Sequence, residues 1–201
     1  MYIDLNALEA RHAHDLLTSC VIPRPIAWVS TVSPDGKTNL APFSFFTGIS
    51  WAPPVLAISV VNRADGTEKD TVLNIRQTNE FVVNLVSQDL LGAMEDSARR
   101  IPYGDDLYCI KGIDLERSKT VRPYRISQAK VSFECTLEQI VTVGEGANAG
   151  NLILGRIQMM AAADELLRNG REVDWKSMNA LGRLSGNRYC VIDSVIESQP
   201  N

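Results

Sequence analysis

The first half of the chain alternates apolar and polar positions in short runs that are typical of β-strands. Residues 25–33 alternate apolar with small polar side chains, and residues 39–46 resume the pattern as a second strand. Between them, Pro34-Asp-Gly-Lys37 has the chemistry of a turn, because proline presets φ and glycine accepts a positive φ. The pattern therefore predicts a β-hairpin over residues 25–46.

Further strands follow at intervals along the rest of the chain. Residues 54–61 form a continuous apolar run, which predicts a strand buried on both faces. Another strand is expected at 80–86 and a last one at 189–196. Residues 128–143 and 151–161 are long β-rich stretches joined by a glycine-rich turn.

Helical signals are short and lie between the strands. Residues 70–77 predict a helix that Thr67 or Asp70 can cap, and residues 87–99 predict a second one. The stretch 103–123 is irregular, and no regular alternation of strands and helices is present. We therefore expect a mainly β, Greek-key-like barrel with a few peripheral helices, and not a doubly wound parallel sheet.

Length and composition suit one domain over residues 1–201, because 45% apolar and 22% charged residues supply both a core and a solvated surface. No run approaches the length of a membrane span, and the first residues lack a signal-peptide pattern. The expected location is the cytoplasm, without membrane contact. A net charge of −4 argues against a nucleic-acid partner, which would favour a basic surface.

The cysteines and histidines do not form a pattern of known chemistry. Cys20, Cys109, Cys135 and Cys190 are scattered without zinc-ligand spacing, so we interpret them as buried, inert thiols. The neighbouring His12 and His14 are better explained as exposed helical or loop positions than as metal ligands or part of a nucleophile triad. Demanding chemistry would have to come from a cofactor.

Two segments favour such a cofactor. The first, Asn39-Leu-Ala-Pro-Phe-Ser-Phe-Phe-Thr-Gly48, offers phenylalanines with a few polar groups at a strand end. A wall of this kind suits a planar aromatic ligand, although a strand end packed into the core explains the same residues.

The second segment runs from Asn62 and Arg63 to Lys69-Asp-Thr71, a polar loop that leads into a helix N-terminus. Free backbone N–H groups, the helix dipole and two cations suit a phosphate, although an ordinary solvated loop remains the alternative. Because the two segments belong to neighbouring elements, an aromatic and phosphate-bearing ligand such as FMN can touch both.

These motifs, taken in order, resemble the flavin reductase-like family of FMN-binding split-barrel proteins, to which flavoredoxin and the reductase component of nitrilotriacetate monooxygenase belong. The resemblance covers about residues 18–195. It rests on Pro23-Arg-Pro-Ile-Ala-Trp-Val-Ser-Thr31, Ala41-Pro-Phe-Ser-Phe-Phe46, Pro53-Pro-Val-Leu56, Lys69-Asp-Thr71, Leu154-Gly-Arg-Ile157 and Leu181-Gly-Arg-Leu-Ser-Gly-Asn-Arg-Tyr189.

The resemblance implies a six-stranded antiparallel split β-barrel, a homodimer, and FMN held without a covalent bond near the dimer interface. It also implies three groups of cofactor-binding residues. The flavin ring and ribityl chain would lie along Ala41, Pro42, Phe43, Ser44 and Phe45. The phosphate would lie near Asn62, Arg63, Lys69, Asp70 and Thr71. Trp28 would lie beside the ring, and Arg183 would reach the site, across the dimer or within one chain.

Many small flavin reductases of this group carry a histidine linked with nicotinamide use, where this chain has Ala149-Gly-Asn151. Three hypotheses follow. The leading one is an FMN-dependent oxidoreductase that uses NADH or NADPH and passes electrons to free flavin, an acceptor protein or a monooxygenase. The second is a flavoredoxin-like electron carrier without nicotinamide activity, and the third is a barrel that has lost its cofactor.

Overall fold

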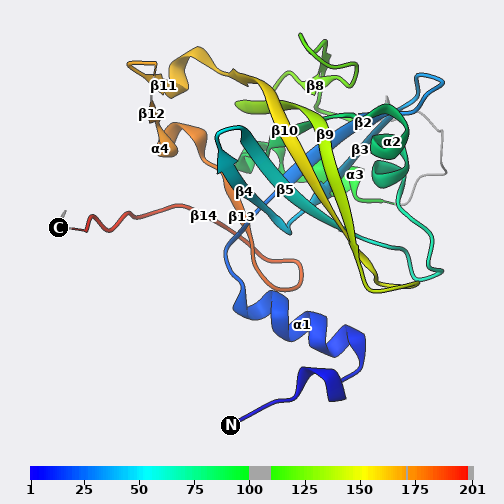
Figure 1. The fold of residues 1–201 in the computed structure, drawn as a ribbon. Coiled ribbons are helices and arrows are strands. Elements are labelled where there is room, and N and C mark those ends of the chain that lie inside the picture. The colour runs from blue at the N-terminus through cyan, green and yellow to red at the C-terminus, as the bar shows by residue number, and fades with distance from the viewer. Residues whose placement is uncertain (100–109, 171, 199–201) are drawn as a thin grey trace.

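The computed structural model describes residues 1–99, 110–170 and 172–198, and its main feature is a curled antiparallel sheet of seven strands (Figure 1). Every neighbouring pair in this sheet runs antiparallel. The strand order is β3-β2-β6-β9-β10-β5-β4, with bounds β2 Ala27–Val32, β3 Thr38–Phe43, β4 Phe46–Trp51, β5 Pro54–Val61, β6 Glu80–Leu85, β9 Val131–Val143 and β10 Gly150–Ala162.

The mainly β, antiparallel architecture is as expected, but the main sheet has seven strands where six were expected. The difference arises at Ser44 and Phe45, where the chain leaves β3 and begins β4. β4 pairs with β5 and does not continue the hairpin with β2. The expected strand over 39–46 is therefore two strands at opposite edges of the sheet.

Several short strands complete the β structure. A second sheet has the order β1-β13-β14, in which Arg24 is the register partner of Arg183. The predicted strand at 189–196 is confirmed only as far as Val191. The bounds are β1 Arg24–Pro25, β13 Leu181–Arg183 and β14 Tyr189–Val191, with two further pairs, β7 Leu115–Glu116 with β8 Arg125–Ile126 and β11 Leu167–Arg168 with β12 Glu172–Val173.

The helices are short and lie around the barrel. α2 packs against β2 and β3, whereas α1 projects from one end of the barrel (Figure 1). The helix predicted over 87–99 is a 3₁₀ turn followed by α3. The bounds are α1 Ala10–Cys20, α2 Asp70–Thr78, α3 Leu91–Ser97 and α4 Trp175–Met178, with 3₁₀ turns at Leu5–Ala7, Gln88–Leu90 and Asp164–Leu166.

The irregular stretch expected over 103–123 lies partly outside the described residues, since these resume at residue 110. Within the described ranges, no helix is both long and apolar enough to span a membrane. Of the cysteines that the structure describes, Cys135 is buried, and burial raises the pKa of its thiol. The prediction of a buried thiol is thus confirmed there but is wrong for Cys20, which is exposed, and for Cys190, which is only half-buried. Cys109 lies outside the described residues.

β2 is buried along its whole length because it separates two apolar clusters. Ala27 and Val29 face the barrel interior, where they pack with residues such as Phe81 and Ile153. Trp28, from the opposite face of the same strand, belongs to a second cluster beneath α3. Alternation along one strand therefore sends neighbouring side chains into different parts of the molecule.

Gly155 on β10 gives a first testable prediction for the barrel interior. A Cβ atom at this position would lie 2.2 Å from Cζ of Phe81, whose ring is fully buried. We expect Gly155→Ala to lower the free energy of unfolding by about 1–3 kcal/mol, the usual range for an overpacked core. Urea denaturation measures this change.

The matched control is Gly48→Ala on β4, because a Cβ atom there meets no atom within 4 Å. Its urea midpoint should stay near that of the wild type. Equal midpoints for the wild type and Gly155→Ala would contradict the packing described for Phe81.

Candidate functional site

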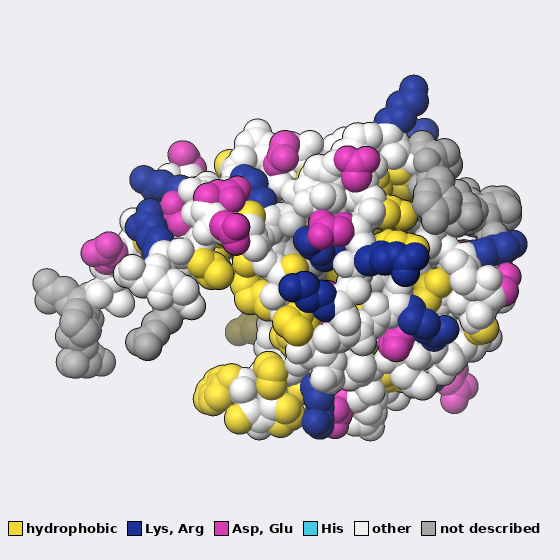
Figure 2. All heavy atoms as spheres, turned by 90° about the horizontal axis from the view of Figure 1, so that it is seen from above, with side chains coloured by type: hydrophobic (Ala, Val, Ile, Leu, Met, Phe, Trp, Pro, Cys, Tyr) yellow, Lys and Arg dark blue, Asp and Glu magenta, His cyan; other side chains and the backbone are white. Residues whose placement is uncertain are grey.

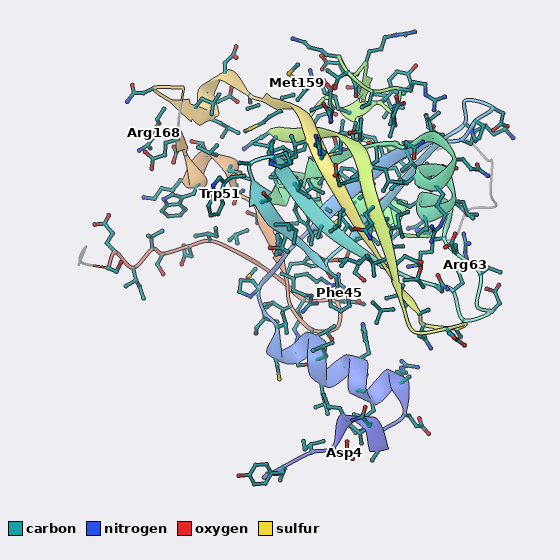
Figure 3. The ribbon with its side chains drawn as sticks, in the orientation of Figure 1. Asp4, Phe45, Trp51, Arg63, Met159 and Arg168 are labelled. Atoms are coloured by element: carbon teal, nitrogen blue, oxygen red, sulfur yellow. The ribbon has the colours of Figure 1, made fainter. Side chains whose placement is uncertain are left out.

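A cavity of about 780 Å³ lies where the β3–β4 connection meets α1, α3, the start of α2 and the β13–β14 hairpin. Figure 3 shows Phe45 at the edge of the barrel that faces α1, whereas Arg63 lies at the side, on the loop that leads to α2. The volume falls in the range of pockets that enclose a small-molecule ligand or cofactor.

One wall of the cavity is the segment that the sequence analysis singled out. Pro42, Phe43, Ser44 and Phe45 all line the cavity. Ala41 does not, because it packs against the cluster inside the barrel. Phe43 belongs to that cluster and also borders the cavity. The explanation of this segment as a strand end packed into the core is therefore confirmed for Phe43.

Lys69 brings a positive charge to the same cavity. It immediately precedes α2, and its Nζ atom lies 5.5 Å from the ring centroid of Phe43. Within the described part of the chain, no carboxylate pairs with this ammonium group. Burial, and then the neighbouring Arg63, lower the pKa of Lys69. A half-buried cation in this situation gains stability from an anionic ligand.

The start of α2 adds backbone donors beside Lys69. No side chain caps this end of the helix. The first N–H groups of a helix lack partners within it, and the dipole favours negative charge there. The combination suits a phosphate group.

The other loop residues predicted to lie near a phosphate are not among those that line the cavity. Arg63 forms an ion pair with Asp70 at 2.5 Å. Asn62 accepts a hydrogen bond from Asn151, which anchors the loop to β10. Thr71 is only 1% exposed, and its hydroxyl accepts a hydrogen bond from an amide side chain. These residues hold the loop that positions Lys69.

The structure does not bring Trp28 to the cavity. Its side chain is completely buried, and its indole Nε1 donates a hydrogen bond to Oγ of Ser97 at 2.8 Å. Arg183, in contrast, lines the cavity. Its guanidinium lies over the ring of Tyr189, with 4.5 Å from Cζ to the ring centroid.

Arg24 is a cavity residue that the sequence analysis missed, although its Pro-Arg-Pro motif was part of the family resemblance. Its guanidinium donates hydrogen bonds to the carbonyls of Thr18 at 2.5 Å, Val21 at 2.7 Å and Leu184 at 3.0 Å. It also donates to Oγ of Ser44 at 3.3 Å. Arg24 therefore ties the end of α1 to the β3–β4 connection and the β13–β14 hairpin.

His14 also borders the cavity. Its ring centroid lies 6.4 Å from that of Phe45, and its Nδ1 is 3.3 Å from Oδ1 of Asp15. The interpretation of His12 and His14 as exposed helical positions is confirmed. The position of His14 beside Phe45 was missed, because no sequence pattern places α1 against the β3–β4 connection.

The chain thus forms a split barrel, a curled antiparallel sheet with an aromatic and cationic cavity at its edge. Residues 18–174 match the model of the flavin reductase like domain, and the chain belongs to this family. The resemblance noted from the sequence motifs is thereby confirmed, and the family supports a flavin-related oxidoreductase.

Individual relatives agree with the family match. The chain is 42% identical over 176 residues to an uncharacterised protein of Aquifex aeolicus (strain VF5), with 88% of each chain covered. It is similar to nitrilotriacetate monooxygenase component B from Bacillus cereus, with a TM-score of 0.93, 28% identity and 98% of each chain covered. Flavoredoxin of Desulfovibrio vulgaris (Miyazaki F) shares the fold, with a TM-score of 0.75, 14% identity and coverage of 98% and 97%.

Proposed function

We propose that this protein binds FMN and transfers electrons from NADH or NADPH to free flavin or to a partner protein. One observation carries the proposal: a single cavity unites the aromatic wall at Phe43–Phe45 with the Lys69 ammonium at a helix N-terminus. The flavin ring would lie against the wall, and the phosphate would bind at Lys69 and the first N–H groups of α2.

In this proposal the cofactor and the chain have different roles. FMN supplies the redox chemistry, because its ring accepts and releases electrons when bound. The chain binds and orients the cofactor through Lys69 and residues 42–45. The likeness to a protein named component B of a monooxygenase supports a monooxygenase as the partner that receives the electrons.

A second candidate is a flavoredoxin-like electron carrier without nicotinamide activity of its own. The stretch Ala149–Asn151 favours it, because this chain has no histidine where related reductases carry one. Asn151 is buried there and donates hydrogen bonds to the carbonyl of Val60 and to Oδ1 of Asn62. The position thus supports the loop before α2.

The proposal includes a homodimer. Large apolar side chains are exposed on several strands of the main sheet, among them Trp51 at 92% on β4 and Met160 at 42% on β10, with β5 between these two strands. Figure 2 shows hydrophobic side chains that reach the surface between charged ones. Exposed apolar surface of this kind is typical of an interface with another chain.

The first experiment is an absorbance spectrum of the purified protein, followed by addition of NADH and NADPH under nitrogen. We expect flavin bands that bleach with one of the nicotinamides. Bands that persist until dithionite is added would support the electron carrier. A protein that stays colourless after incubation with FMN would contradict both and leave a barrel without cofactor.

A further inference from the structure

Two arginines face each other across a strand pair beside the cavity. Arg24 on β1 and Arg183 on β13 are register partners, and both line the cavity. Like charges directly opposite one another in a sheet repel and destabilise the pair. This arrangement calls for a compensating negative charge nearby.

The described residues do not supply that charge to Arg24. The side chain is 5% exposed, and its hydrogen bonds go to three carbonyl groups and one hydroxyl, all of them neutral. No carboxylate among the described residues forms an ion pair with it. Burial, together with Arg183, lowers the pKa of Arg24, which reflects the unfavourable position of the charge.

Arg183 is held in place by neutral groups as well. It donates hydrogen bonds to the hydroxyl of Tyr189 and to the carbonyl of Gly186. Two carboxylates border the cavity, Glu95 and Asp15. Glu95 interacts with the Tyr189 hydroxyl, and Asp15 lies beside His14 with its side chain 65% exposed. In the part of the chain that is described, neither forms an ion pair with Arg183.

The arginine pair is separate from the cation assigned to the FMN phosphate. Lys69 lies beside Phe43 at the start of α2, and the cation that affects its pKa is Arg63. Arg24 contacts Ser44, and the cation that affects its pKa is Arg183. The cavity therefore has two positive centres, contributed by different elements, along the same aromatic wall.

We propose that Arg24 and Arg183 form a second anion subsite, which binds the carboxylate or phosphate group of the molecule that exchanges electrons with FMN. This inference rests on the proposed function, because it assigns Lys69 to the cofactor. A bidentate guanidinium suits both groups, and an anion between the two arginines offsets their mutual repulsion.

The test uses FMN-loaded protein and the variant Arg183→Gln, because Arg24 holds several elements together. Two matched pairs of probes distinguish a carboxylate from a phosphate as the group that the subsite binds. Benzoate and benzamide differ in the carboxylate and are followed by perturbation of the flavin absorbance. Reduced nicotinamide mononucleotide and reduced nicotinamide riboside differ in one phosphate and are compared by KM for flavin reduction.

The sequence analysis counted Arg183 among the cofactor-binding residues, whereas the subsite assigns it to the second anion, so the FMN affinity of the variant is measured first and is expected to stay near that of the wild type. At least one anionic probe should bind about tenfold or more weakly, as on loss of a charge-assisted hydrogen bond, while its neutral counterpart is unaffected. Arg183→Lys should retain part of the affinity for the anionic probe because it keeps the positive charge. This variant replaces Arg183→Gln in the test if the glutamine variant does not fold. The control Arg156→Gln removes an arginine paired with Glu138 away from the cavity and should change none of these values.

Equal discrimination between charged and neutral probes in the wild type and in the Arg183 variants would overturn the proposal. Weaker FMN binding in those variants would also overturn it, since the arginines would then belong to the cofactor phosphate. Failure of the wild type to bind FMN is a different result, which contradicts the proposed function and the subsite together.

Discussion

Replacing Lys69 with alanine is expected to weaken FMN binding by about 1–3 kcal/mol, which corresponds to a dissociation constant roughly five- to 150-fold higher. The ammonium lines the cavity beside Phe43, and it has no carboxylate partner in the described residues. Its loss removes a charge-assisted contact to the phosphate but leaves the aromatic wall intact. Titration of FMN fluorescence measures the change.

Lys176 provides a matched control, because its Nζ atom also lies over an aromatic ring, that of Trp175 at 5.4 Å, but outside the cavity. Lys176→Ala should bind FMN with wild-type affinity. Thr71→Ala should weaken binding less than Lys69→Ala, since the backbone donors of α2 remain. Unchanged affinity in Lys69→Ala would rule out this lysine as the phosphate contact.

The largest effect on stability is expected at Asn84, where alanine should lower the free energy of unfolding by about 3 kcal/mol or more. Asn84 is completely buried at the meeting point of several strands. Its amide nitrogen donates to the carbonyl of Trp28 and to Oγ of Ser30. Its oxygen accepts from the backbone N–H of Ile126 and the hydroxyl of Ser132. Alanine leaves these buried groups without their partner.

Urea denaturation of Asn84→Ala and of the wild type measures this loss directly. Gln158→Ala is the appropriate comparison, because this amide is exposed on β10 and donates a single hydrogen bond to Thr136. Its midpoint should change little. A similar small change for both variants would show that the groups around Asn84 find other partners.

The sequence predicts much of the barrel, because its strands carry strong local signals. The apolar run at 54–61 coincides with β5, and the glycine-rich turn joins β9 and β10 as expected. β4 was missed because the phenylalanine-rich run continues across Ser44 and Phe45 without a proline or glycine to mark the change of direction. Only the pairing with β5, a tertiary feature, separates it from β3.

Residues that line the cavity were predictable where they are close in sequence. Residues 42–45 and Lys69 were identified from two short segments, and both line the cavity. The position of Trp28 was not predictable, because β2 is buried on both faces and its pattern does not tell which face borders the cavity. Arg24 contacts Leu184 across 160 positions, a separation at which no local pattern indicates contact.

The two edge strands of the main sheet, β3 and β4, are joined directly by Ser44 and Phe45. A hydrogen bond holds this connection against β5, because the N–H of Ser59 donates to the carbonyl of Phe45 at 2.8 Å. A ligand that binds at this connection in the folded chain, and not in the unfolded chain, adds its binding free energy to the stability of the fold. FMN bound there, as proposed, would therefore stabilise the folded barrel.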